Sequence, residues 1–350
     1  MSRGLSRSCG IAARGSRVGI AAFSPEVRVR VQATPALLDS TQSFGHQVAS
    51  TSSTQRQVGG TRGYRSTGSH APNIDPVDLS FDVTHPNEAT TPDQCLVVCH
   101  GLFGSKQNWR SLAKMFAHKL GMPVFTLDLR NHGHSPHAEP HSYNAMASDI
   151  SHFLQKHDLK NVNLLGHSMG GKAVMAFALN EEYNKSLRTL ISVDMSPAKG
   201  KISPEFAAYT DGMIEVEKAK VKTKSEADKI LQKVEPILPT RQFLLTNTRT
   251  HPHGHLTFRI PLGLLASAIP SIGDFPYEPP PPVNATSPQW TGPTLFLKGE
   301  HSRYLNRHNI PVAERFFPNM RLEVLDTGHW VHAEKPAETV AMVEAFVKGA

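Results

Sequence analysis

The sequence LLGHSMGGKA at residues 164–173 matches two motifs that belong to different chemistries. Read as G-x-S-x-G, it is the turn between a strand and a helix that exposes a nucleophilic serine, here Ser168. Read as G-x-x-x-x-G-K, it is most of a phosphate-binding loop that ends at Lys172. Such a loop needs a Ser or Thr after the lysine to hold Mg²⁺, and this sequence has Ala173 there. The stretch therefore favours a serine nucleophile.

Segments on both sides of this stretch alternate between two kinds of hydrophobic pattern. Short continuous apolar runs are typical of buried strands, and apolar residues spaced by three and four are typical of helices. The expected strands are residues 77–83 at an edge of the sheet, then 95–100, 123–129, 162–166, 187–194, 293–299 and 322–326. The expected helices are residues 109–120, 143–157, 172–179 and 337–349. This alternation predicts a mostly parallel sheet with helices on both faces.

The alternation breaks between residues 196 and 290. This part holds charged helical segments such as residues 225–234, and it ends in the proline-rich run YEPPPP at residues 277–282. We therefore expect a helical cap at 196–290, inserted between a first part of the α/β core at 75–195 and a second part at 291–350.

The first 74 residues differ in composition from the rest. They contain nine arginines, no lysine, and only Glu26 and Asp39 as acidic residues, which accounts for the whole net charge of +7. An arginine-rich, acid-poor start is typical of a mitochondrial transit peptide, although a disordered tail has a similar composition. RGYRST at residues 62–67 resembles a processing site, so the mature protein is expected to begin near residue 65 and to lie in the mitochondrial matrix.

Beyond these residues the chain is formally neutral, so the composition indicates no basic face for nucleic acid. No stretch reaches the ~18 apolar residues of a membrane span, so no transmembrane segment is expected. Small molecules are therefore the expected partners.

Acyl transfer by a serine also needs donors for the oxyanion of its intermediate. One expected donor is the backbone N–H of Met169, directly after the nucleophile. The other is the N–H of Leu102, in the loop CHGLFGS at residues 99–105 that follows an early strand. The neighbouring His100, Gly101 and His167 are expected to contact substrate.

The general base is expected late in the chain. DTGHW at residues 326–330 follows the last predicted strand, which favours His329, whereas His332 is expected to be a surface or packing histidine. Four further histidines lie close together in a turn-rich segment: His132, His134, His137 and His141. Their spacing fits no ordinary metal site, so we expect a loop there and neither a metal nor a cofactor.

The acid that orients the base has two candidates. Most α/β-hydrolases carry it three residues after a glycine at the end of the penultimate strand, but that position is Ser302. Asp194 ends the strand that follows the nucleophile helix, and the ends of neighbouring parallel strands meet at one edge of the sheet. Asp194 is the first choice and Glu300 the alternative. Otherwise Asp194 would cap the first helix of the cap.

Six segments together resemble the mitochondrial α/β-hydrolase family that includes animal abhydrolase domain-containing protein 11 and the yeast ethanol acetyltransferases. They are HGLFGSKQNW (100–109), DLRNHGHSPH (128–137), GHSMGGKA (166–173), VDMSP (193–197), RQFLLTN (241–247) and GHWVHAEKP (328–336). The resemblance implies an α/β-hydrolase fold over roughly residues 78–349. It also implies a Ser–Asp–His set at Ser168, Asp194 and His329.

The expected function is that of a mitochondrial serine hydrolase, which cleaves carboxylic esters or thioesters through an acyl-Ser168 intermediate. The resemblance implies an alternative, alcohol acyltransfer from acetyl-CoA to ethanol. A third possibility is a non-catalytic mitochondrial interaction protein that has kept the fold. The sequence does not determine the acyl chain or the acceptor.

Overall fold

The computed structural model describes residues 74–281 and 288–350. The expected transit peptide with its processing site, and the last residue of the proline-rich run, lie outside the described residues, so the structure does not bear on them.

In the described residues, seven strands form one sheet in the order β1-β3-β2-β4-β5-β8-β9. The strands are β1 (Phe81–Thr84), β2 (Cys95–Cys99), β3 (Val124–Leu127), β4 (Val162–His167), β5 (Leu187–Val193), β8 (Thr294–Gly299) and β9 (Met320–Leu325). Only β1, at the edge, runs antiparallel to its neighbour, and the other pairs are parallel. The predicted mostly parallel sheet is confirmed.

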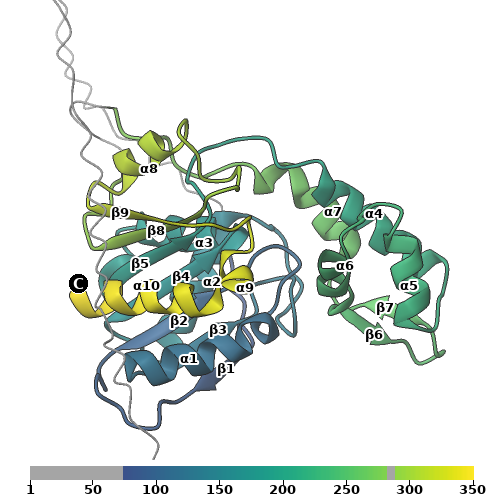
Figure 1. Cartoon of the computed structure of the whole chain (residues 1–350), viewed down its shortest axis with the longest axis horizontal. Helices are drawn as coiled ribbons and strands as arrows, with labels where there is room; N and C mark the ends of the chain where they lie inside the picture. The colour runs from purple at the N-terminus through teal and green to yellow at the C-terminus, as the bar shows by residue number, and fades with distance from the viewer. Residues whose placement is uncertain (1–73, 282–287) are drawn as a thin grey trace, which may run out of the picture. The chain divides into compact units, whose positions relative to one another are not determined.

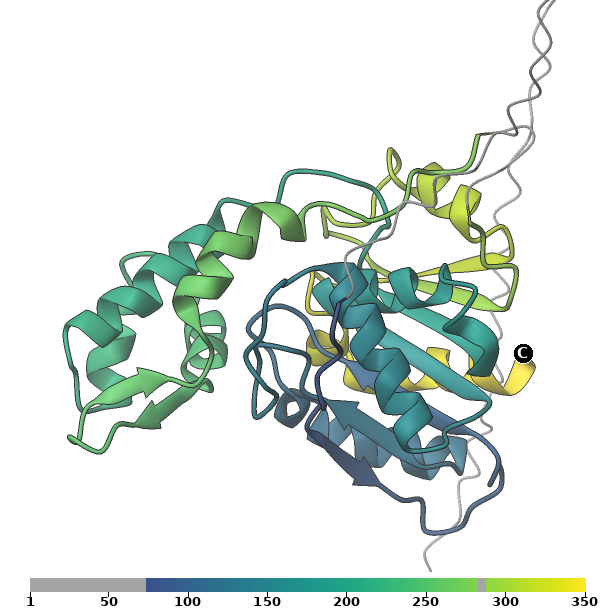
Figure 2. The same ribbon diagram turned by 180° about the vertical axis from the view of Figure 1, so that it is seen from behind.

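Helices cover both faces of this sheet (Figures 1 and 2). The core helices are α1 (Arg110–Leu120), α2 (Tyr143–Lys156), α3 (Met169–Ala178), α8 (Ile310–Phe316), α9 (Val331–Glu334) and α10 (Pro336–Gly349), with short 3₁₀ turns η1 (Lys106–Trp109) and η2 (Asn184–Ser186). One hydrophobic cluster joins α1 and α10 to the sheet, and a second joins α2, α3 and α8. Strands β2 and β4 lie between these clusters, which explains why every residue of both is buried.

Between β5 and β8 the chain forms a mainly helical insertion. It consists of α4 (Glu205–Lys218), α5 (Lys224–Leu231), α6 (Leu238–Leu245), the hairpin of β6 (Thr248–Thr250) and β7 (Leu256–Phe258), and α7 (Leu262–Ile272). A capping box starts α5, because Thr223 accepts the N–H of Glu226 and Glu226 accepts that of Thr223. These elements lie in the range where the sequence predicts a cap, and we call them the cap.

Several boundaries differ from the sequence prediction. Strand β1 begins at Phe81, four residues later than expected, because only Phe81–Thr84 pairs with β3. Helix α3 begins at Met169 and not at Lys172, since two glycines in its first turn hide the helical pattern. Helix α8 and the β6–β7 hairpin were not expected, and within the predicted helical cap only residues 225–234, which overlap α5, were given bounds. In the described residues no helix is long and apolar enough to cross a membrane.

Candidate active site

The turn between β4 and α3 holds Ser168 in a strained backbone conformation. Its φ of 54° and ψ of −120° are unfavourable for a residue with a side chain, and they are typical of a serine nucleophile at this turn. The two glycines of the motif allow the tight packing. A Cβ on Gly166 would lie 2.2 Å from the carbonyl oxygen of Gly170, and one on Gly170 would lie 2.5 Å from that of Cys99. Glycine is therefore required at both positions.

The structure brings together Ser168, Asp194 and His329, the three residues that the sequence predicted. They follow β4, β5 and β9, respectively. The Ser168 hydroxyl lies 3.0 Å from Nε2 of His329. Nδ1 of His329 lies 2.7 Å from Oδ2 of Asp194. Because the carboxylate can only accept, His329 donates from Nδ1, and this leaves Nε2 free to accept the serine proton.

Asp194 is fully buried, and three donors hold its carboxylate. Besides His329, the N–H of Gly299 donates to Oδ1 at 3.0 Å, and the hydroxyl of Ser302 donates to Oδ2. Ser302 stands three residues after Gly299, where the sequence analysis looked for the acid, and its hydroxyl bonds to Asp194 after β5. The first cap helix has Pro204 as its N-cap, so Asp194 does not cap it.

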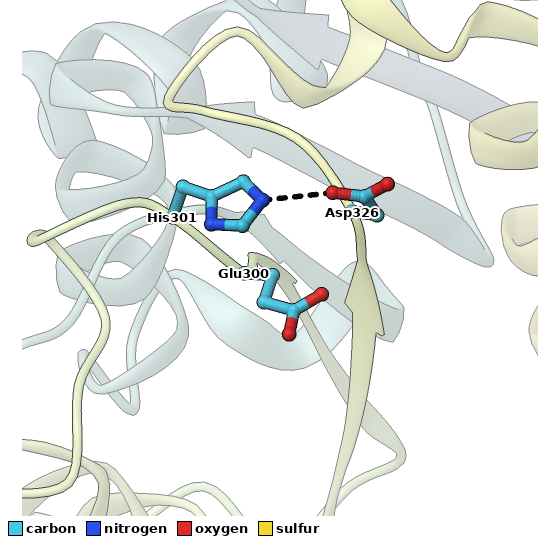
Figure 3. Close-up of side chains that lie close together, drawn as sticks. All are labelled: Glu300, His301 and Asp326. Atoms are coloured by element: carbon cyan, nitrogen blue, oxygen red, sulfur yellow. Dashed lines mark hydrogen bonds and ion pairs between the residues drawn. The ribbon is translucent and has the colours of Figure 1, made fainter.

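Glu300, the alternative acid, lies elsewhere. Figure 3 shows it beside His301 and Asp326, with the ring of His301 bonded to Asp326 at 2.8 Å. All three side chains are exposed, and their candidate ligand atoms lie within 4.8 Å of one another. Exposed groups of this kind are common in proteins without a bound ion, so the cluster alone assigns no metal. Glu300 has no hydrogen bond to His329 among the described residues.

A cavity of about 510 Å³ opens at Ser168. Leu102 and Met169 also line it, together with the chain between β5 and α4 and the loop after β8. Within the described part of the chain, the backbone N–H groups of Leu102 and Met169 donate to no protein acceptor. The two expected oxyanion donors thus lie on the wall of the serine's own cavity.

The three residues expected to contact substrate do not line this cavity. His100 is buried, and its ring bonds to the backbone of Gly101 and Leu129. His167 is also buried, and its Nε2–H donates to the carbonyl oxygen of His329 at 3.0 Å. Burial, and the nearby His332 and His329, hold the pKa of His167 well below its ordinary value, so its ring is neutral. The rings of His100 and His167 thus bond to backbone near the site, and their expected contact with substrate stays a prediction.

Gly101 acts through its lack of a side chain. A Cβ there would lie 3.0 Å from Nδ1 of His167 and 3.1 Å from the Cβ of Ser168. Because Gly101 has no Cβ, the loop after β2 can approach Ser168 closely.

The remaining histidines have structural surroundings. His332 is buried and stacks on Trp109 with ring centroids 4.2 Å apart, as expected for a packing residue. His132 and His141 are buried, whereas His134 and His137 are exposed, so the four do not converge on one point. Burial lowers the pKa of both His132 and His141 to about 3. Their residues form a loop, as the sequence predicted.

Lys172, which first suggested a phosphate-binding loop, is also accounted for. Its buried Nζ donates to the carbonyl oxygens of Ala198, Gly273 and Asp274 at 3.0, 2.9 and 2.8 Å. These carbonyls belong to the two segments that enter and leave the cap. Burial lowers the pKa of Lys172 to about 8. The lysine therefore anchors the cap connections to α3.

Two residues close to Asp194 and His329 were given no role by the sequence. The ring of Tyr304 packs 4.1 Å from that of His329, centroid to centroid, and Tyr304 also lines the cavity. The other is Ser302, bonded to Asp194. The sequence pointed to position 302 only as the place of a missing acid, and the path of the loop after β8 brings both residues to the site.

Comparisons with known proteins identify the family of this fold. A family model described as the alpha/beta hydrolase fold matches residues 94–336. A probable alcohol acetyltransferase of Saccharomyces cerevisiae is 35% identical over 78% of this chain and 84% of its own length. The sn-1-specific diacylglycerol lipase ABHD11 of Danio rerio is 35% identical over 78% of this chain and 83% of its own.

A solved structure described as a marine microorganism esterase is 30% identical and has a TM-score of 0.67, covering 77% of this chain and 99% of the esterase. The family model spans more than half of the chain, and both curated relatives are matched over most of their length. The chain therefore belongs to the α/β hydrolase family, as an ester-hydrolase-type enzyme related to ABHD11 and the yeast alcohol acetyltransferases.

Proposed function

We propose that this protein cleaves carboxylic esters or thioesters through an acyl intermediate on Ser168. The observation that carries the proposal is the Ser168–His329–Asp194 chain of hydrogen bonds, at 3.0 and 2.7 Å, at the wall of a cavity. The esterase and lipase names of the relatives support the same chemistry.

In the first half of the reaction, Nε2 of His329 takes the proton of Ser168 while the serine oxygen attacks the acyl carbon. The carbonyl oxygen becomes an oxyanion, which the N–H groups of Leu102 and Met169 stabilise. His329 then gives its proton to the leaving alkoxide or thiolate, and the acyl group stays on Ser168. Asp194 keeps the imidazole in the required tautomer and stabilises the imidazolium.

In the second half, water gives a proton to His329 and its oxygen attacks the acyl carbon. Collapse of the second oxyanion releases the carboxylic acid, and the proton returns from His329 to the serine oxygen. Every group therefore ends in its starting state.

An alcohol acyltransferase is the second candidate. An alcohol in place of water would release the acyl group as a new ester with the same residues, and one relative is named a probable alcohol acetyltransferase. Incubation with acetyl-CoA, with and without ethanol, separates the two: hydrolysis gives mainly acetate, and transfer gives ethyl acetate. Ethyl acetate as the main product at modest ethanol concentration would reverse this order.

Labelling with a fluorophosphonate probe tests the nucleophile. We expect the purified protein to be labelled, and Ser168→Ala to lose labelling and ester hydrolysis together. If Ser168→Ala is labelled as fully as the unmodified protein, the nucleophile is another residue. No labelling of the unmodified protein would favour a non-catalytic interaction protein.

We further propose that the enzyme works in the mitochondrial matrix. The support is the arginine-rich, acid-poor composition of residues 1–74. Fractionation of mitochondria and N-terminal sequencing of the mature protein test this proposal, with a start near residue 65 expected. An intact Met1 end in the cytosol would contradict it.

A further inference from the structure

The loop that carries the Leu102 donor is a strained tight turn. The N–H of Gly104 donates to the carbonyl oxygen of Gly101 at 2.9 Å, which closes a four-residue turn. Its third residue, Phe103, has a φ of 60°. A turn with positive φ at this position ordinarily has glycine there, because a side chain is strained in this conformation. Other contacts must therefore hold Phe103 in place.

On one side, the N–H of Phe103 donates to Nε2 of His132 at 3.1 Å. The other ring nitrogen of His132 donates to the carbonyl oxygen of Arg130 at 3.0 Å, which fixes the tautomer. The ring is fully buried, and this lowers its pKa to about 3, so it stays neutral and can accept. The N–H of Phe103 is thus occupied and does not point to substrate.

On the other side, the carbonyl oxygen of Phe103 accepts from the side chain of Asn247 at 2.7 Å. Only the amide NH₂ can donate to a carbonyl, so the orientation of this side chain is determined. Asn247 stands between α6 and β6, and it is the last residue of the RQFLLTN segment, to which the proposed mechanism assigns no role. It is therefore a cap residue that contacts the core.

Asn247 is itself held firmly. It is 1% exposed, its N–H donates to Leu244 at 3.1 Å, and its carbonyl oxygen accepts from Arg259 at 2.9 Å. The amide therefore reaches Phe103 from a backbone bonded to both α6 and the residue after β7.

We propose that Asn247 is a positioning residue, which holds the strained turn so that the N–H of Leu102 faces the oxyanion. This inference rests on the proposed ester hydrolysis and adds a task for the cap. The peptide groups of a tight turn move together, so loss of the bond to Phe103 lets the turn relax and displaces the adjacent Leu102 donor. The oxyanion forms only as the reaction proceeds to the transition state. Displacement of the Leu102 donor therefore weakens stabilisation of the transition state and leaves binding of the substrate unchanged.

Two substitutions test the bond. Asn247→Asp keeps the size of the side chain but places an oxygen against the Phe103 carbonyl, and Asn247→Leu removes the donor without adding a charge. We expect kcat to fall at least about tenfold in both variants, with KM unchanged within about twofold. The loss should be smaller than the factor of about 10²–10³ that follows removal of a whole oxyanion donor. Thr246→Ala, at the exposed neighbouring position, is the matched control and should keep full activity.

A second readout separates positioning from general stability. A trifluoromethyl ketone forms an adduct on the serine whose oxygen occupies the oxyanion site. We expect its affinity, and the rate of fluorophosphonate labelling, to fall by about the same factor as kcat. Circular dichroism and thermal melting establish that each variant is folded at the assay temperature, and if Asn247→Asp fails to fold, Asn247→Leu decides.

Unchanged kcat in a folded variant, or a loss confined to KM, would overturn the role of Asn247 while leaving the proposed hydrolase intact. If the unmodified protein hydrolyses no ester yet is labelled by the fluorophosphonate, the proposed function fails and the labelling rates alone test Asn247. If the unmodified protein is not labelled, both proposals fall.

Discussion

Ser302 and Asp194 follow neighbouring strands and form one hydrogen-bonded group with His329. Ser302 stands after β8, where the sequence analysis looked for the acid, and its hydroxyl donates to the carboxylate of Asp194, which directly follows β5. The ends of these neighbouring parallel strands lie side by side, so a carboxylate from either can reach the same imidazole. The chain after β5 thus supplies the buried carboxylate, and β8 with the loops after β8 and β9 supplies its hydrogen-bond donors.

The roles of Asp194 and Glu300 can be separated directly. We expect Asp194→Asn to lower kcat by on the order of 10⁴, because an amide cannot hold His329 with its proton on Nδ1. Glu300→Gln should change kcat little, since Glu300 is exposed and lies beside His301. The measurement is steady-state hydrolysis of an activated ester, and a larger loss in Glu300→Gln would assign the acid to Glu300.

At the scale of elements, close packing of α3 against the end of β2 fixes the nucleophile turn. The N-terminus of α3 sits against the carbonyl groups of Cys99 and His100, and a Cβ on Gly170 would lie 2.5 Å from both oxygens. The clash is with backbone, which cannot move away as a flexible side chain can. The distance between the two proposed oxyanion donors therefore depends on this contact.

Gly170→Ala should consequently lower both stability and activity. We expect a loss of about 1–3 kcal/mol in the free energy of unfolding, as for other overpacked sites, and at least about a tenfold loss in kcat. Gly263→Ala is the matched control, because Gly263 lies in α7 and a Cβ added there would meet no neighbour within 4 Å, so alanine should stabilise by up to about 1 kcal/mol. Urea unfolding and ester hydrolysis are measured for both variants. If the two variants have the same stability and the same kcat, the packing argument is refuted.

At the scale of the whole molecule, the described core contains several buried histidines whose pKa is lowered. Burial lowers the pKa of His100 to about 4 and those of His132, His141 and His332 to about 3. In the unfolded chain these rings titrate near pH 6.5. Between about pH 6.5 and 4 the unfolded state therefore binds more protons than the folded state, and acid favours unfolding.

The free energy of unfolding should thus fall steeply as the pH drops below about 6.5. Each buried histidine contributes up to about 1.4 kcal/mol per pH unit in that range. Urea unfolding at about pH 7.5, 6 and 5 measures the slope. His332→Phe, which keeps the stack on Trp109, should make the slope shallower by roughly one histidine's contribution. A stability that stays constant or rises toward pH 5 would contradict the burial of neutral rings.

The sequence predicted those parts of the fold in which a residue pattern has only one structural explanation. Strands β2 and β4 are buried on both faces, so their apolar runs are unambiguous, and Gly166 and Gly170 mark a turn that tolerates no side chain. The sequence predicted a helical cap but not the bounds of most of its helices, because each helix buries only two to four residues. The start of helix α3 was predicted three residues too late, because glycine is a poor helix former.

The sequence by itself determined the serine motif, the late histidine and the alternation of strands and helices, since each depends on residues that are close along the chain. Only the tertiary structure decided that the carboxylate of Asp194 bonds to His329 and that Ser302 donates to the same carboxylate. It also showed that the ring of His167 bonds to the backbone of His329. It alone joined Asn247 to Phe103, 144 residues away. Contacts between distant segments depend on how strands and loops are arranged in space, and the spacing of residues along the chain does not specify that arrangement.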